Sequence, residues 1–204
     1  MFKLVTGGNG RNVCMGKVTN VNGEYFTLSG ADWDKKTKKE VPYNLELKND
    51  TENVTLTEGE TIVAMILPHR KDPNKGVAEE IAKSGECMSI INDHGNEKVI
   101  LYGKIYNKKW NQSHSVIRLD FRDIKDTEGN MVGQEVSYKD QFNFEYSTHW
   151  LNVSFFQGDS AYNAEKADKR LEKGKEIILV CTRKESVYQG KNYINYLGAK
   201  FSVL

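Results

Sequence analysis

Short runs of alternating apolar and polar residues, divided by glycine and asparagine turns, recur along the whole chain. Such runs are typical of β-strands with one buried face, and 10 tyrosines and 8 phenylalanines against 3 prolines also favour strands. Asn22-Gly23 and Gln189-Gly190 are typical tight-turn pairs between them. The expected strands lie near Val13–Val21, Tyr25–Ser29, Val41–Leu47, Ile62–Leu67, Lys98–Tyr106, Val116–Ile124, Trp150–Phe156, Glu176–Thr182 and Tyr193–Leu197.

Two segments have helical spacing instead. Ser160–Lys173 has Asp159 as a plausible N-cap and Gly174 directly after its end. Val77–Lys83 is shorter and also ends close to a glycine. The expected fold class is therefore all-β with short helices.

Two pairs of segments echo one another along the chain. Leu56–Leu67 (LTEGETIVAMIL) resembles Leu171–Thr182 (LEKGKEIILVCT), and Val13–Val21 (VCMGKVTNV) parallels Val99–Asn107 (VILYGKIYN). Each pair places a strand at a comparable point of a five-strand barrel, which favours two similar barrels in tandem. A coincidental strand–turn–strand match is the alternative.

The polar stretch Asp93–Glu97 (DHGNE) is the natural boundary, so the expected domains are 1–95 and 96–204. Charge differs between the halves: residues 1–97 hold 12 Lys+Arg and 15 Asp+Glu, whereas residues 98–204 hold 17 and 13. A polyanionic partner of the second half and a solvated surface explain this difference about equally well.

The rest of the composition argues against several classes of protein. Cys14, Cys87 and Cys181 form no ligand pattern, which favours reduced thiols and a cytoplasmic location. No apolar run approaches the roughly 20 residues of a membrane span, and no signal peptide is evident. The four histidines are isolated, and no catalytic signature is present. We expect a non-enzymatic protein without a metal, a cofactor or a membrane partner.

The most informative segment is WLNVSFF, Trp150–Phe156. Because side chains alternate along a strand, Leu151, Val153 and Phe155 would share a core face. The opposite face would then mix Trp150 and Phe156 with small polar residues. A half-solvated aromatic platform on which bases stack explains this mixture. Packing of the two aromatics under a loop or in a dimer interface explains it equally well.

Three blocks of the second half stand in a distinctive order: Lys98–Ile105 (KVILYGKI), His149–Gly158 (HWLNVSFFQG) and Ala164–Lys184. Together they resemble the bacterial and phage single-stranded DNA-binding proteins of the SSB type. The first block is similar to that family's first strand, the second to its third strand, and the last to its helix, lysine-glycine turn and fourth strand. The order and spacing match over about half of the chain, and the resemblance implies an OB-fold, a five-stranded Greek-key barrel.

The resemblance also implies individual roles. Trp150 and Phe156 match the stacking aromatics of the family, and Lys98 matches a basic residue near the DNA path. Arg183 and Lys184 match the basic residues that lead into the hairpin between strands four and five.

Other positions depart from the family or extend it. Glu185 stands where the family usually has an aromatic, and Tyr188 substitutes for it only if the hairpin register shifts. In VIRLDFRDI, alternation places Arg118 and Arg122 on one face as candidate phosphate contacts, with Phe121 in the core.

The first half offers one further candidate. ADWDKKTKKEVPY places Trp33 in an expected loop beside four lysines, where it could contact a nucleic acid strand. A tryptophan lid over the barrel mouth, followed by a solvated charge run, is the alternative.

These features predict tandem OB-fold barrels that bind single-stranded DNA with little sequence preference, in replication, recombination or repair. The alternatives are a protein-interaction module that has lost DNA binding, and a single-stranded RNA-binding protein. SSB-type assemblies present about four barrels, so the resemblance implies a homodimer. The chain ends directly after its last strand, so we expect no acidic C-terminal recruitment tail, which suits a phage or mobile-element protein.

Overall fold

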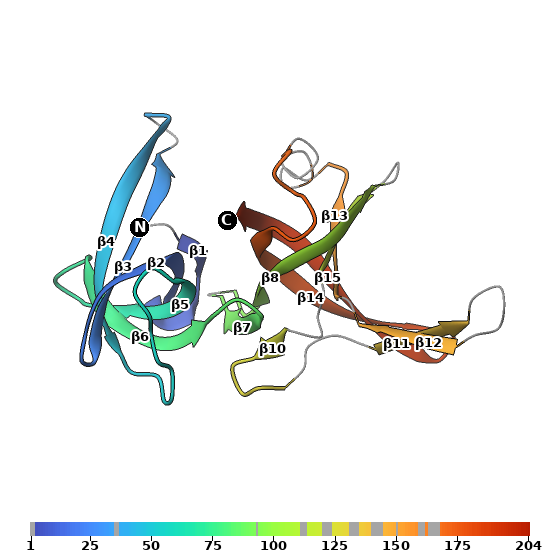
Figure 1. Ribbon diagram of the computed structural model, residues 1–204, viewed down its shortest axis with the longest axis horizontal. Coiled ribbons are helices and arrows are strands. Elements are labelled where there is room, and N and C mark those ends of the chain that lie inside the picture. The colour runs from blue at the N-terminus through green and yellow to red at the C-terminus, as the bar shows by residue number, and fades with distance from the viewer. Residues whose placement is uncertain are drawn as a thin grey trace. The chain divides into compact units, whose positions relative to one another are not determined.

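The computed structural model describes residues 3–34, 37–92, 94–110, 114–119, 124–130, 135–139, 145–149, 151–158, 162 and 168–204 (Figure 1). The described chain is nearly all strand, as expected. The first part contains β1 (Lys3–Thr6), the short 3-10 helix η1 (Gly8–Gly10), β2 (Asn12–Asn22), β3 (Tyr25–Asp34), β4 (Lys39–Asn49), β5 (Thr61–Pro68), β6 (Lys75–Ala82) and β7 (Glu86–Ile91). The second part contains β8 (Glu97–Trp110), β9 (His114–Leu119), β10 (Lys125–Asp126), β11 (Glu135–Lys139), β12 (Glu145–His149), β13 (Leu151–Phe156), β14 (Glu176–Tyr188) and β15 (Lys191–Val203).

The chain divides into two compact units. The first unit consists of Met1–Lys83 and Met88–Glu97, and the second consists of Ser84–Cys87 and Lys98–Leu204. Strand β7 therefore contributes residues to both units.

The first unit is a closed five-strand barrel. Its strands follow the order β2-β3-β4-β6-β5 and return to β2, and β1 pairs with β2 in addition. Neighbours are antiparallel except for β4 and β6, which run parallel. Inward-facing side chains such as Phe26, Leu28 and Leu45 fill the barrel, because alternate positions of each strand point inward.

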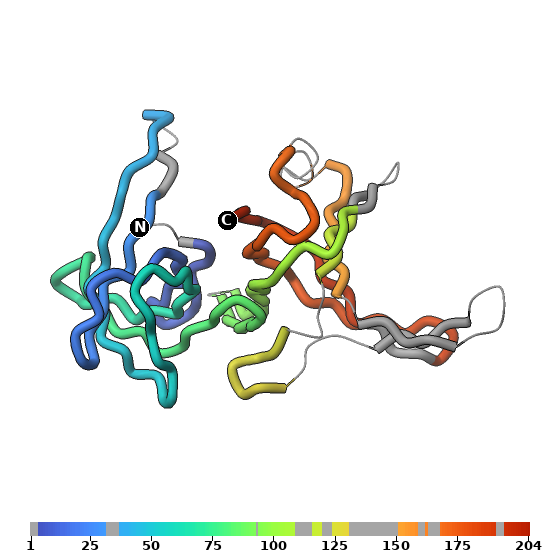
Figure 2. Tube along the Cα trace, in the orientation of Figure 1, coloured from blue at the N-terminus to red at the C-terminus, as the bar shows by residue number. Residues whose placement is uncertain are grey.

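The second unit repeats this strand order. Strands β8-β14-β15-β13-β9 close back on β8, and the one parallel pair is β13 with β15. The third and fifth barrel strands are thus parallel in both units, which is the OB-fold order. Strands β14 and β15 continue past the barrel as a two-stranded arm, drawn in orange-red at the lower right of the tube (Figure 2). The predicted tandem OB-fold barrels are confirmed.

The internal echo of the sequence has a structural counterpart in two glycine turns. The amide of Gly59 donates to the carbonyl oxygen of Val18, and the amide of Gly174 donates to that of Ile105, both at 2.8 Å. Both glycines have positive φ, 90° and 85°, which glycine adopts without steric cost. Each turn precedes the fourth barrel strand and binds it to the first. The echoing segments therefore occupy equivalent places.

The predicted helix Val77–Lys83 is wrong, because Lys75–Ala82 forms β6. This strand bonds to β4 on one side and β5 on the other, and it buries Ala78 and Ile81 in the barrel. Tertiary pairing overrides the local helical spacing here.

The other predicted helix, Ser160–Lys173, is described only in part. Tyr162 is helical and buried, whereas residues 168–173 form turns and coil, so the helix does not reach Lys173. The carboxylate of Asp168 accepts hydrogen bonds from the backbone and side chain of Arg170, and this local turn competes with a helix. The rest of the segment lies outside the described residues.

We expected Trp33 in a loop, because lysines follow it in the sequence. It lies in a strand instead. Its backbone belongs to β3, opposite Glu40 of β4. The β3–β4 ladder continues from Tyr25 to Asp34, which pairs with Lys39.

Candidate nucleic-acid interface

Strand β13 separates core residues from outward residues, as its sequence predicted. Leu151, Val153 and Phe155 are buried in the core of the second unit. Phe156 is 46% exposed on the opposite side, next to a half-buried serine and an exposed asparagine. An aromatic ring of this size in contact with water offers a stacking surface.

The register with β9 places a basic residue on the same outer surface as Phe156, four positions away along β13. Arg118 lies opposite Asn152, and its Nε donates to the Asn152 Oδ1 at 2.8 Å. Core residues Ile117 and Leu119 flank Arg118, so its side chain leaves the barrel. The hydrogen bond orients the guanidinium across the outer surface of β9 and β13.

A row of paired residues extends this surface across the barrel. Lys98 Nζ donates to Thr182 Oγ1 at 2.7 Å. Thr182 pairs with Leu197 of β15, and Leu197 pairs with Ser154 of β13. The predicted Lys98 therefore lies on the same outward side as Phe156. We call this surface the β13 face; it comprises Lys98, Arg118, Asn152, Ser154, Phe156, Thr182, Lys184 and Leu197.

The arm of β14 and β15 carries two further predicted residues. Lys184 and Tyr188 lie two and six positions after Thr182, so strand alternation places them on its side of the arm. Both are exposed, Tyr188 at 65%. Gln189 and Gly190 form a two-residue turn in which both have positive φ, the type I′ hairpin geometry. The predicted turn is thus confirmed.

Arg183 occupies the other side of β14. It lies opposite the buried Tyr196, and its Nη1 is 2.7 Å from the Glu185 Oε1. Burial raises the pKa of the Tyr196 phenol and the nearby Cys87 adds to the increase, while a hydrogen bond from Arg183 works against it. The guanidinium of Arg183 thus already interacts with two protein groups.

Three predicted residues cannot be placed with this surface. Trp150 and Arg122 lie outside the described residues. Trp33 belongs to a strand of the first unit, and only its backbone is described. Conversely, Thr182 and Leu197 were missed, because only the register between β14, β15 and β13 shows that they border Ser154.

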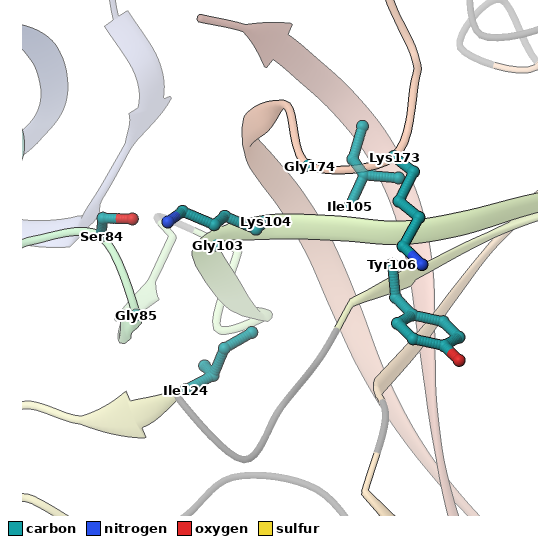
Figure 3. A pocket seen from close by; sticks show the side chains of 9 residues that line it. All are labelled: Ser84, Gly85, Gly103, Lys104, Ile105, Tyr106, Ile124, Lys173 and Gly174. Atoms are coloured by element: carbon teal, nitrogen blue, oxygen red, sulfur yellow. The ribbon is translucent and has the colours of Figure 1, made fainter.

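The second unit also contains a pocket of about 300 Å³ beside β8 (Figure 3). Its lysines, Lys104 and Lys173, hold their ammonium groups well apart, and that of Lys173 lies 5.1 Å from the ring centre of Tyr106. The two cations do not converge on one point, so the pocket does not have the arrangement of a phosphate site.

The described part of the chain can also be compared with the requirements of a metal site, a reactive thiol and a membrane span. No group of three or more His, Cys, Asp or Glu side chains there could hold a metal ion. The three cysteines are buried as free thiols, and desolvation raises the pKa of Cys181 far above its usual range. Within the same residues, none of the helices has the length and apolar character needed to cross a membrane.

The strand order of the two barrels defines a tandem OB-fold protein. The solved structures similar to it include the wild-type single-stranded DNA binding protein from Thermus aquaticus and a deletion mutant of that protein. Each is 16% identical, with a TM-score of 0.28, and the match covers 95% of this chain and 92% and 93% of those chains, respectively. No protein-family model and no curated protein matches the sequence. The fold assignment rests on this chain's own strand pairing.

Proposed function

We propose that this protein binds single-stranded DNA on the β13 face and along the adjoining arm. The observation that carries the proposal is the exposed ring of Phe156, which shares the outer surface of the second and third barrel strands with Arg118. OB-folds bind oligonucleotides on this surface and on the loops beside it.

The chemistry of the face favours a single strand over a duplex. Unpaired bases expose their ring faces, and stacking on an aromatic side chain contributes about 1–3 kcal/mol per base. Arg118 and Lys184 supply positive charge for phosphates, and Lys98 supplies more at the far edge of the face. Stacking and phosphate contacts read no base edges, so binding on this face has little sequence preference.

The proposal includes residues and properties inferred from the sequence. Trp150 precedes Leu151 and extends the stacking platform, and Arg122 adds a phosphate contact. The protein acts without enzymatic activity in the cytoplasm as a homodimer, which would bring four barrels together, and it protects single strands in replication, recombination or repair. The basis of this paragraph is the resemblance of residues 98–204 to the SSB type.

Titration with oligo-dT at low salt tests the proposal. We expect a mobility shift, and we expect quenching of tryptophan emission as Trp150 stacks on bases. Unchanged emission together with an unshifted oligonucleotide would refute DNA binding and leave the protein-interaction alternative. Tighter binding of poly-U than of oligo-dT in competition would show that RNA is the ligand instead.

Lys184→Ala should flatten the salt dependence of oligo-dT binding, because it removes a phosphate contact on the arm. For a single strand, one lost contact changes the slope of log K against log salt by about 0.7. Arg183→Ala is the matched control. The guanidinium of Arg183 lies on the other side of β14 from Lys184 and pairs with Glu185, so the slope of log K against log salt should hardly change. Equal slopes for Lys184→Ala and the wild type would remove Lys184 from the interface.

A further inference from the structure

The first unit has a hollow of about 320 Å³ at the turn between β2 and β3. Three neighbouring strands supply its walls, β2, β3 and β4. The lining residues are Asn20, Asn22, Tyr25, Phe26, Thr27 and Glu46. The hollow thus lies at the turn between the first two strands of the barrel, which is a ligand-binding region in OB-folds.

An irregularity of the β2–β3 ladder shapes the hollow. The register shifts between Thr19 and Asn22, and Asn20 has a φ of 54°, in the left-handed region that asparagine tolerates better than most residues. Tyr25 begins β3 next to this irregularity and is 52% exposed, whereas the adjacent Phe26 is buried in the barrel. One wall of the hollow is therefore an accessible aromatic ring.

The polar groups of the lining are suited to a base edge. The side-chain amides of Asn20 and Asn22 make no hydrogen bond with any described residue. The Glu46 carboxylate accepts from the Lys75 Nζ at 2.9 Å through Oε1, and a carboxylate has about four acceptor sites, so it can accept more. The hollow thus combines the Tyr25 ring, the hydrogen-bond donors and acceptors of two asparagine amides, and the acceptors of one carboxylate.

The charges around the hollow disfavour a phosphate. None of the lining residues is cationic, and one is a carboxylate. The lysines nearby are already in ion pairs: Lys75 with Glu46, and Lys48 with Glu24 and Asp50. The charge of Glu24 raises the pKa of Lys48, and the hydrogen bond to Glu46 raises the pKa of Lys75.

From the ring, the amides and the carboxylate, we infer that this hollow binds one unpaired nucleobase and prefers guanine. The guanine edge presents two adjacent N–H donors, which a carboxylate accepts together, while thymine presents one and adenine has an acceptor beside its amino group. Tyr25 stacks on the base, Glu46 accepts from its edge, and the asparagine amides bond to its remaining polar atoms. The inference builds on the proposed function, because it adds a base-reading subsite in the first unit to a protein that binds single strands through its second unit.

Equilibrium dialysis of the full chain against guanosine, cytidine, adenosine and thymidine tests the subsite. Nucleosides carry no phosphate, so the cations of the β13 face contribute little to their binding. We expect guanosine to bind at least about fivefold more tightly than the other three. Glu46→Gln should abolish that preference, and Tyr25→Ala should lower guanosine affinity about tenfold.

Matched variants separate binding from folding. Glu24→Gln removes an exposed carboxylate on the same hairpin but outside the hollow, so the guanosine preference should persist. Tyr25→Phe keeps the ring and should keep the affinity. Equal binding of the four nucleosides, or equal loss with Glu24→Gln and Glu46→Gln, would overturn the inference.

Oligonucleotides distinguish this inference from the proposed function. An oligo-dT with one central dG should bind more tightly than plain oligo-dT, and Glu46→Gln should remove the difference. If oligo-dT binds but guanosine shows no preference, the subsite is refuted and the β13 face stands. If guanosine binds while oligo-dT does not, the proposed function is refuted and the subsite stands.

Discussion

Replacing Phe156 with alanine should weaken the binding of oligo-dT by about 5- to 150-fold, because one base loses its stacking partner at a cost of about 1–3 kcal/mol. The ring is 46% exposed on the β13 face and lies two positions after Ser154, on the strand that also presents Asn152 to Arg118. A fluorescence or mobility-shift titration at fixed salt measures the change.

The salt dependence and the stability provide the controls for this variant. Phe156→Ala removes no charge, so the slope of log K against log salt should equal that of the wild type. An exposed side chain contributes little to folding, so the urea midpoint should shift only slightly. Affinity unchanged by Phe156→Ala would show that bases do not stack on this ring, and the binding surface would have to lie elsewhere.

The neighbouring substitution Phe155→Ala should have the opposite profile, with a loss of about 3–5 kcal/mol in the free energy of unfolding. Phe155 is 1% exposed and meets Phe201 edge to face, with ring centres 6.1 Å apart. It also fills the space that a side chain at Gly198 would need. Its removal therefore leaves a cavity between β13 and β15, and urea unfolding monitored by circular dichroism measures the cost.

Phe155→Leu tests the origin of that loss. Leucine refills part of the cavity, so this variant should recover part of the lost stability. A Phe155→Ala variant about as stable as Phe156→Ala would contradict the inward and outward assignment of β13, on which the position of the β13 face depends.

Strand alternation made the β13 face predictable to a large degree. In residues 151–155 apolar and polar residues alternate strictly, so the barrel core fixes both faces of the strand and leaves Phe156 on the outer one. The Asn22-Gly23 and Gln189-Gly190 pairs form turns with positive φ at glycine, as their sequences indicate. The repeated segment before the fourth barrel strand forms the same glycine turn in both barrels. These are short-range signals, and the sequence contains them in full.

Long-range pairing accounts for what the sequence did not predict. Val77–Lys83 has helical spacing, yet hydrogen bonds from β4 and β5 hold it as a strand. Thr182 joins the β13 face only through a register with β15 that no local pattern specifies. Arg183 was grouped with Lys184 as a basic pair, although adjacent strand residues point to opposite sides, and its partner Tyr196 comes from another strand.

The two glycine turns at Gly59 and Gly174 bear on how such a chain diversifies. The same amide-to-carbonyl bond anchors the fourth strand to the first in both barrels, so the two barrels share this element of their scaffold. The outward side chains take no part in this anchor and are free to diverge separately. Exchanging outward residues between corresponding strands, such as β4 and β13, should therefore transfer ligand preference between the barrels while each keeps its own core.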